Sequence, residues 1–306
     1  MFNLSKFFRQ RRMILLSALG MVAFMATAQV YGPGGGFGRG GRGRGGFGGG
    51  MGGASRAYVI SDPAEQAMVD KMQKAIKPGF EEDVFTFARL IYAPGYGGGR
   101  SWDDDSPDAD LNLGFRMYQV TSLKVHPAFK YIHITPHEMA DYPFVYLVAN
   151  TRLALTDDEI KTLRHYLLSG GFLMAEDFWG DSTWSYIYGQ FKRIFPDRQL
   201  VELPLSHPIF HSVFDFKFLP QMPSAGRGFS PDGPSYDYSD YPTGDHYPHY
   251  YAIYDDHDHM MALICRNNHY GDGWEHEGEN MDYFNRFSMP QAYPMFINIL
   301  FYTMSH

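Results

Sequence analysis

The sequence is very poor in cysteine, with only Cys265 among 306 residues. A single cysteine cannot form a disulfide within the chain, which excludes a disulfide-stabilised fold. Cys265 lies in the apolar run MMALICR, and this setting predicts a buried, unreactive thiol rather than a catalytic nucleophile. The fold must therefore be stabilised by an ordinary hydrophobic core.

The spacing typical of a zinc site is also missing. Six histidines gather in one part of the chain, and they are His246, His249, His257, His259, His269 and His276. No C-x-x-C pair or helical H-x-x-x-H motif accompanies them. We interpret these histidines as solvent-facing or structural, and the sequence predicts neither a metal site nor a cofactor.

No hydrophobic run is long enough to predict a stable membrane span. Residues 13–28 provide about 16 residues, whereas a transmembrane helix needs roughly 20. Four basic residues precede this run and A-T-A ends it, so we expect an export signal, residues 1–28, that is cut after Ala28. No cysteine stands directly after the run, which excludes a lipoprotein anchor. The expected location is the periplasm, the cell envelope or the medium, and an uncleaved anchor formed by residues 13–28 is the alternative.

Basic residues are scarce in the rest of the chain. Residues 29–56 are rich in glycine and arginine and predict a flexible linker. Residues 54–306 carry 19 basic and 34 acidic side chains, a net charge of −15. This balance argues against a nucleic-acid partner and favours neutral ligands or cations.

The most informative stretch, residues 144–180, predicts a strand, a helix and a second strand. Phe144 to Ala149 and Phe172 to Ala175 are apolar runs of strand length, typical of strands buried on both faces. Between them, Thr156 and Glu159 form a capping box that starts an amphipathic helix, which ends at a pair of glycines. Two buried strands joined by a helix must be parallel, so this is one βαβ unit.

Other elements extend this unit on both sides. The expected strands are residues 84–92, 131–134 and 199–203, with a hairpin of residues 251–254 and 260–266. The expected helices are residues 109–122, a helix capped by Asp181 or Ser182 and ended by Pro196, and a last helix after Pro290. Residues 220–250 are a long irregular insertion and residues 268–280 a polar loop. The pattern predicts one α/β domain over residues 57–306, with a flavodoxin-like open parallel sheet and helices on both faces.

Polar side chains follow several of the predicted strands. In open α/β sheets, ligands bind beyond the carboxyl ends of the strands. The candidate ligand-binding residues at this edge are Asp103, Asp105, His137, Glu138, Asn150, Arg152, Glu176, Asp177 and Trp179. In the acid-rich loop 93–107, the acids either cap the next helix or bind a cation or polar ligand, and the sequence leaves both open.

Several motifs resemble the bacterial family catalogued as domain of unknown function 4159. They are FTFARLIY, YPFVYLVAN, TDDEIKTLRHYLLSGGFLMAEDFWG, FPDRQLVELPLSHPIFH, GDGWE and QAYPMFINILFYTMSH. The resemblance implies a fold of the class I glutamine amidotransferase-like superfamily, whose catalytic members carry a nucleophilic cysteine in the turn after the strand at residues 172–175. This chain has Asp177-Phe178-Trp179-Gly180 there, so we expect no amidotransferase activity. The resemblance implies no substrate.

Three functions remain open on this basis. The first is a non-catalytic envelope module that binds a glycan, a cation or a protein through the carboxyl edge of the sheet. The second is a hydrolase acting on a carbohydrate or envelope polymer, with Glu176 and Asp177 working alongside Asp103, Asp105 or Glu138 as acid and base. The third is a scaffold without a ligand.

Overall fold

The structure is a computed structural model that describes residues 63–79, 84–92, 102–149, 153–224, 245–277 and 280–306. The expected export signal and linker lie outside the described residues, as do residues 225–244 of the long insertion and most of loop 93–107. Within the described part of the chain, every helix is too short or too polar to cross a membrane.

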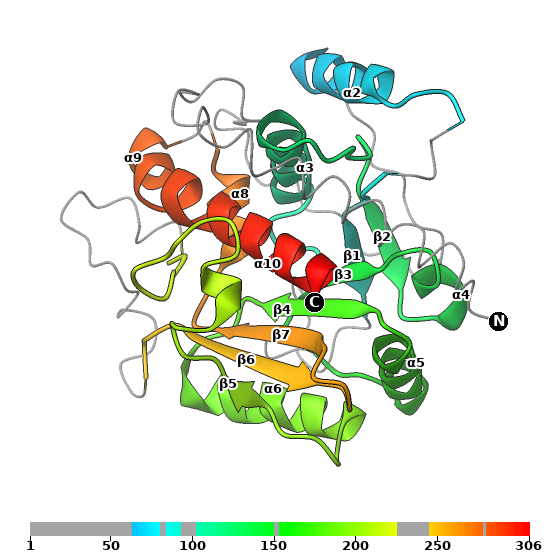
Figure 1. The fold of residues 1–306 in the computed structure, drawn as a ribbon, viewed down its shortest axis with the longest axis vertical. Helices are drawn as coiled ribbons and strands as arrows, with labels where there is room; N and C mark the ends of the chain where they lie inside the picture. The colour runs from blue at the N-terminus through cyan, green and yellow to red at the C-terminus, as the bar shows by residue number, and fades with distance from the viewer. Residues whose placement is uncertain (1–62, 80–83, 93–101, 150–152, 225–244, 278–279) are drawn as a thin grey trace, which may run out of the picture.

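A seven-stranded sheet forms the centre of the fold, in the order β2-β1-β3-β4-β7-β6-β5 (Figure 1). The strands are β1 (Ala88–Ile91), β2 (Lys130–His133), β3 (Phe144–Val148), β4 (Phe172–Glu176), β5 (Val201–Glu202), β6 (His249–Tyr254) and β7 (Met260–Arg266). The neighbours from β2 to β7 pair in parallel, whereas β6 pairs antiparallel with β7 and with β5. The sheet is therefore mixed with a mostly parallel core, which confirms the α/β class and is consistent with a flavodoxin-like sheet.

Helices cover both faces of this sheet (Figure 1). They are α2 (Pro63–Ala75), α3 (Asp108–Val120), α4 (Pro136–Met139), α5 (Asp157–Leu168), α6 (Gly180–Ile194), α8 (Tyr270–Glu275), α9 (Met281–Tyr283) and α10 (Tyr293–Ser305), with the 3₁₀ turn η2 (Pro208–Phe210) and the π-helix η3 (Phe284–Ala292). Alternate residues of the central strands point into two separate cores. One core contains α3, α8 and α10, and the other contains α5 and α6.

The predicted βαβ unit is present with its expected start and stop signals. Phe144 to Val148 of β3 pair in register with Phe172 to Glu176 of β4, and all ten residues are buried. The capping box of Thr156 and Glu159 begins α5. Cys265 lies fully buried in β7, where burial raises the pKa of its thiol well above the ordinary value, as expected of an unreactive thiol.

Three local predictions were wrong. The strand expected at residues 199–203 is the shorter β5, which pairs antiparallel with β6 at the sheet edge instead of joining the parallel strands, because β7 occupies the place beside β4. Neither Asp181 nor Ser182 caps α6. The helix begins at Gly180, with Trp179 at the N-cap position, and the side chain of Asn267 accepts the bond from the Gly180 amide.

The third error concerns residues 268–280, where we expected a polar loop. Residues 270–275 form α8, whose residues Tyr270 to Trp274 are all buried. The last helix does begin after Pro290, at Tyr293, but the chain is already helical from Met281 through α9 and η3. The sequence did not predict α8, because two glycines and two acidic residues lower its helix propensity. The helix is stabilised instead by packing against α3.

Candidate functional site

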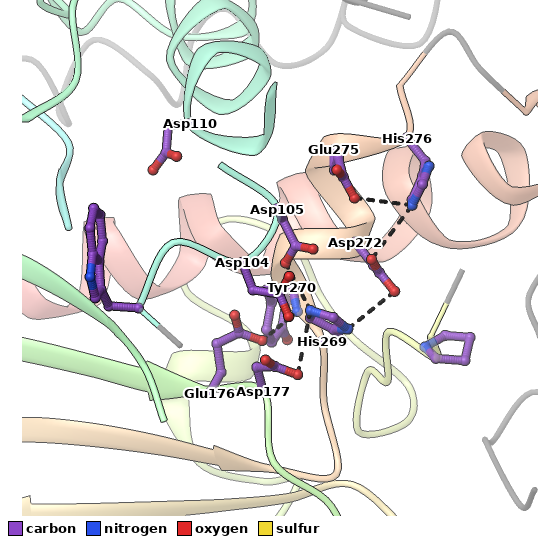
Figure 2. A network of polar contacts seen from close by, with 12 residues as sticks. Asp104, Asp105, Asp110, Glu176, Asp177, His269, Tyr270, Asp272, Glu275 and His276 are labelled. Atoms are coloured by element: carbon purple, nitrogen blue, oxygen red, sulfur yellow. Dashed lines mark hydrogen bonds and ion pairs between the residues drawn. The ribbon is translucent and has the colours of Figure 1, made fainter. Parts of the chain in front are cut away.

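Acidic residues and a histidine meet beyond the carboxyl ends of β4 and β7. These strands are parallel neighbours, with Ala175 opposite Ile264. The segment after β4 therefore lies beside the segment after β7, and the Asp177 amide donates to the carbonyl of Asn268 over 3.1 Å. Figure 2 shows Asp177, Asp105 and Asp272 around the imidazole of His269. We call these four residues the acid–histidine cluster.

Asp177 occupies a sharp turn between β4 and α6. Its φ of 69° lies in the left-handed region that is uncommon for residues other than glycine. The next residue fixes the turn, because Phe178 is buried and its carbonyl accepts the Asn267 amide over 2.9 Å. The turn places Asp177 Oδ1 at 3.4 Å from His269 Nε2. A strained backbone of this kind persists only where its surroundings determine it, which is common at functional sites.

Asp105 reaches the same imidazole from the loop before α3. Its Oδ2 lies 2.8 Å from His269 Nε2, its side chain is buried, and its φ is 60°. The backbone of α8 passes close to this carboxylate, since a Cβ added at Gly271 would lie 2.0 Å from Asp105 Oδ2. The position of Asp105 thus depends on a glycine in α8.

His269 is the centre of the cluster, with a side chain that is only 10 % exposed. Nε2 faces Asp105 and Asp177, and Nδ1 lies 3.1 Å from Asp272 Oδ2. Burial alone would lower the pKa of His269, but the three carboxylates raise it well above its ordinary value. In the absence of a cation, the cluster therefore holds an imidazolium.

The carboxyl groups of the cluster differ in their affinity for protons. Burial raises the pKa of Asp177 well above its ordinary value, the charges of Glu176 and Asp105 add to the increase, and His269 opposes it. Burial also raises the pKa of Asp105. The pKa of Asp272 is lowered, because attraction from His269 and His276 exceeds the effect of burial. The cluster thus combines two carboxyl groups whose pKa values are raised with one whose pKa is lowered.

Glu176 lies beside the cluster and is fully buried. One oxygen accepts the hydroxyl of Tyr146, and the other accepts the backbone amide of Tyr270 over 2.6 Å. Burial raises its pKa to about 7. Glu176 therefore ties β4 to β3 and to the first residue of α8, directly after His269.

A second group extends from Asp272 toward the surface. His276 Nε2 lies 3.2 Å from Glu275 Oε2 and 3.5 Å from Asp272 Oδ1. Burial alone would lower the pKa of His276, but hydrogen bonds to Asp272 and Glu275 raise it to about 11. Asp272 thus has a histidine on each side.

The structure brings three of the sequence-predicted site residues together, namely Asp105, Glu176 and Asp177. Glu138 instead bonds to the amide and ring of His133 at the end of β2, with β1 and β3 between it and β4.

Three further predicted residues, His137, Trp179 and Asp103, are not part of the cluster contacts given above. His137 is exposed on α4, and Trp179 is buried at the start of α6. The carbonyl of Asp103 accepts the Ser106 amide within the loop before α3. That helix has Pro107 at its N-cap position and no side-chain cap, so the acids of the loop do not cap it. Asn150 and Arg152 lie outside the described residues.

Sequence reasoning missed His269 and Asp272. Both were placed in a polar loop, and His269 was one of six histidines without a zinc spacing. The usable signal was the strand before them. Residues 260–265 are uniformly apolar, which is typical of a strand buried on both faces, and pairing this strand in parallel with β4 would have placed His269 beside Asp177.

The fold and the cluster together define an α/β domain whose mostly parallel sheet carries buried acids and a histidine at its carboxyl edge. The family model described as "Domain of unknown function (DUF4159)" matches residues 86–304. The chain belongs to this family, since the match covers more than half of its length. No curated protein matches the chain.

Proposed function

We propose that this DUF4159 domain binds a divalent metal cation at the acid–histidine cluster. The observation that carries the proposal is the environment of one imidazole, His269, which is enclosed by three carboxylates and almost excluded from water. Buried carboxylates need protons, cationic partners or metal ions as compensation. One histidine cannot compensate three buried acids, and a divalent cation would take the place of the protons that they otherwise hold.

The geometry around His269 supports coordination through Nε2. Asp272 holds Nδ1, which is the arrangement that orients a metal-binding histidine and presents its other nitrogen. On the Nε2 side, Asp105 and Asp177 provide carboxylate oxygens. A related set of possible ligands, with Asp272 in place of Asp177, also lies close together, since atoms of Asp105, His269 and Asp272 are within 4.8 Å of one another. A mixture of oxygen and nitrogen ligands favours Zn²⁺ or Mn²⁺ over Ca²⁺, which takes oxygen ligands.

This proposal departs from the sequence-based expectation of no metal. The four residues of the cluster come from three separate segments of the chain, so no motif of fixed spacing could predict a metal site from them. The proposal retains the expected location in the periplasm or cell envelope, which rests on the basic and apolar pattern of residues 1–28. There, a bound cation would provide a contact point for an envelope glycan or a protein partner.

Calorimetry tests the proposal directly. Purified protein is stripped with a chelator and titrated separately with Zn²⁺, Mn²⁺, Mg²⁺ and Ca²⁺. We expect one strong site for Zn²⁺ or Mn²⁺ that His269→Gln and Asp177→Asn weaken by at least tenfold. His211→Gln is the matched control, because His211 pairs with Asp215 on the surface. A folded chain that takes up none of these ions would exclude the proposal.

A second candidate is the hydrolase, supported specifically by the Asp177 turn. Asp177, His269 and Asp272 lie in a row, in which Asp177 could act as nucleophile or acid, the imidazolium of His269 as a proton donor, and Asp272 as the acid that orients the imidazole. Release of soluble fragments from purified envelope polysaccharide by the wild type, and its loss in Asp177→Asn, would favour this candidate. Stoichiometric cation binding without such release would favour the binding module.

A further inference from the structure

A fully buried arginine outside the acid–histidine cluster holds both ends of the segment that carries Asp105. Arg89 lies on β1. Its Nε and Nη2 donate to the two carboxylate oxygens of Asp110 over 3.1 and 3.0 Å. Its Nη1 donates to the carbonyls of Trp102 and Asp104 over 3.1 and 2.6 Å. The same guanidinium therefore bonds to the chain before Asp105 and to the helix after it.

Asp105 needs such support. A non-glycine residue at a φ of 60° keeps that conformation only where its neighbours fix it. The Asp104 carbonyl bonded by Arg89 belongs to the peptide group directly before Asp105, and α3 begins three residues after it. Arg89 also lies 5.0 Å from the ring centre of Tyr146, whose hydroxyl donates to Glu176, the neighbour of Asp177.

We propose that Arg89 is a positioning residue for the cation site, which it serves by fixing the direction of the Asp105 carboxylate. The inference rests on the proposed function, because it takes Asp105 as a ligand. A lysine would keep the charge, but its single ammonium group cannot reproduce the planar, forked set of bonds to one carboxylate and two carbonyls.

The test is Mn²⁺ affinity in the full chain, measured by calorimetry on Arg89→Lys with Arg116→Lys as the control. Arg116 is also buried and pairs with Glu277, so its replacement likewise disturbs a buried ion pair. We expect Arg89→Lys to weaken Mn²⁺ binding about tenfold or more, the range found for residues that orient ligands, and Arg116→Lys to change it less than twofold. Unfolding curves establish that both variants are folded.

A double-mutant cycle distinguishes positioning from general destabilisation. If Arg89 acts through Asp105, Arg89→Lys should weaken binding no further once Asp105→Asn is present. If Arg89→Lys is poorly folded, Asp110→Asn replaces it, because this change removes the negative charge and one of the two oxygens that hold the guanidinium. Wild-type binding in a folded Arg89 or Asp110 variant would overturn this inference and leave the proposed function intact. Failure of the wild type to bind would instead remove the proposed function.

Discussion

The domain contains two kinds of buried charge, and they differ in how the charge is balanced. Arg89 and Asp110 form a one-to-one pair in which both side chains are fully buried and the carboxylate accepts two bonds. In the acid–histidine cluster, three carboxyl groups share His269. Removing one partner of a balanced pair leaves a buried charge without compensation and destabilises the fold, whereas an unbalanced cluster holds protons that a ligand can replace. This difference in charge balance distinguishes the Arg89–Asp110 pair, which has a structural role, from the acid–histidine cluster, which we propose as the functional site.

The largest effect is expected from breaking the balanced pair. Arg89→Ala leaves Asp110 buried without its cation and should lower the free energy of unfolding by about 3–5 kcal/mol. Denaturant titration measures this loss. Arg164→Ala should cost far less, because the Arg164–Asp197 pair is largely exposed to solvent. Equal losses in the two variants would contradict the comparison.

Gly271→Ala is expected to disturb the cluster by crowding alone. The new Cβ would fall on the Asp105 carboxylate, whose backbone is held in place, so the side chain must turn away from His269. We expect a loss of about 1–3 kcal/mol in stability together with weaker cation binding. Gly189→Ala is the control, since a Cβ at this helical position meets nothing within 4 Å and should raise stability slightly. Unchanged cation affinity in Gly271→Ala would argue against Asp105 as a ligand.

The cluster should make the cation-free protein less stable as the pH rises. Glu176, Asp105, Asp177 and His269 all have raised pKa values, so the folded chain binds more protons than the unfolded chain. For Glu176 this stability is lost between the ordinary pKa of 4.5 and the folded value of about 7, at about 1.4 kcal/mol per pH unit.

Thermal unfolding at several pH values, with and without Zn²⁺, measures the effect. A bound cation takes the place of the protons, so the stabilisation by Zn²⁺ should increase with pH. The variant Glu176→Gln should show a shallower pH dependence than the wild type. A cation-free protein that grows more stable from pH 5 to pH 7 would contradict the assignment of raised pKa values to the cluster.

The smallest effect on stability is expected from Asp177→Asn. Asparagine tolerates the left-handed backbone at this turn, and the change removes one of several acids that repel one another. The free energy of unfolding should stay within about 1 kcal/mol of the wild-type value while cation binding is lost. Strong destabilisation by this conservative change would place Asp177 with the structural pairs, in the same class as Asp110.

Local signals in the sequence determined much of the fold. The apolar runs at residues 144–149 and 172–175, with the capping box at Thr156 and Glu159, predicted the central βαβ unit with its helix start. Patterns of this kind act between residues that are close in sequence, so they can be read without knowing the rest of the chain. The α/β class, the hairpin of β6 and β7, and the buried cysteine followed from the same kind of evidence.

Only the tertiary structure decided the site. Asp105, Asp177 and His269 are separated by long stretches of chain and meet because β7 pairs in parallel with β4 and because Arg89 holds the loop before α3. The insertion of β7 and β6 at this place in the sheet also moved β5 to the edge. Strand pairing and the burial of charge depend on contacts between segments that are distant in the sequence. The energies of such contacts cannot be predicted from a local pattern of residues.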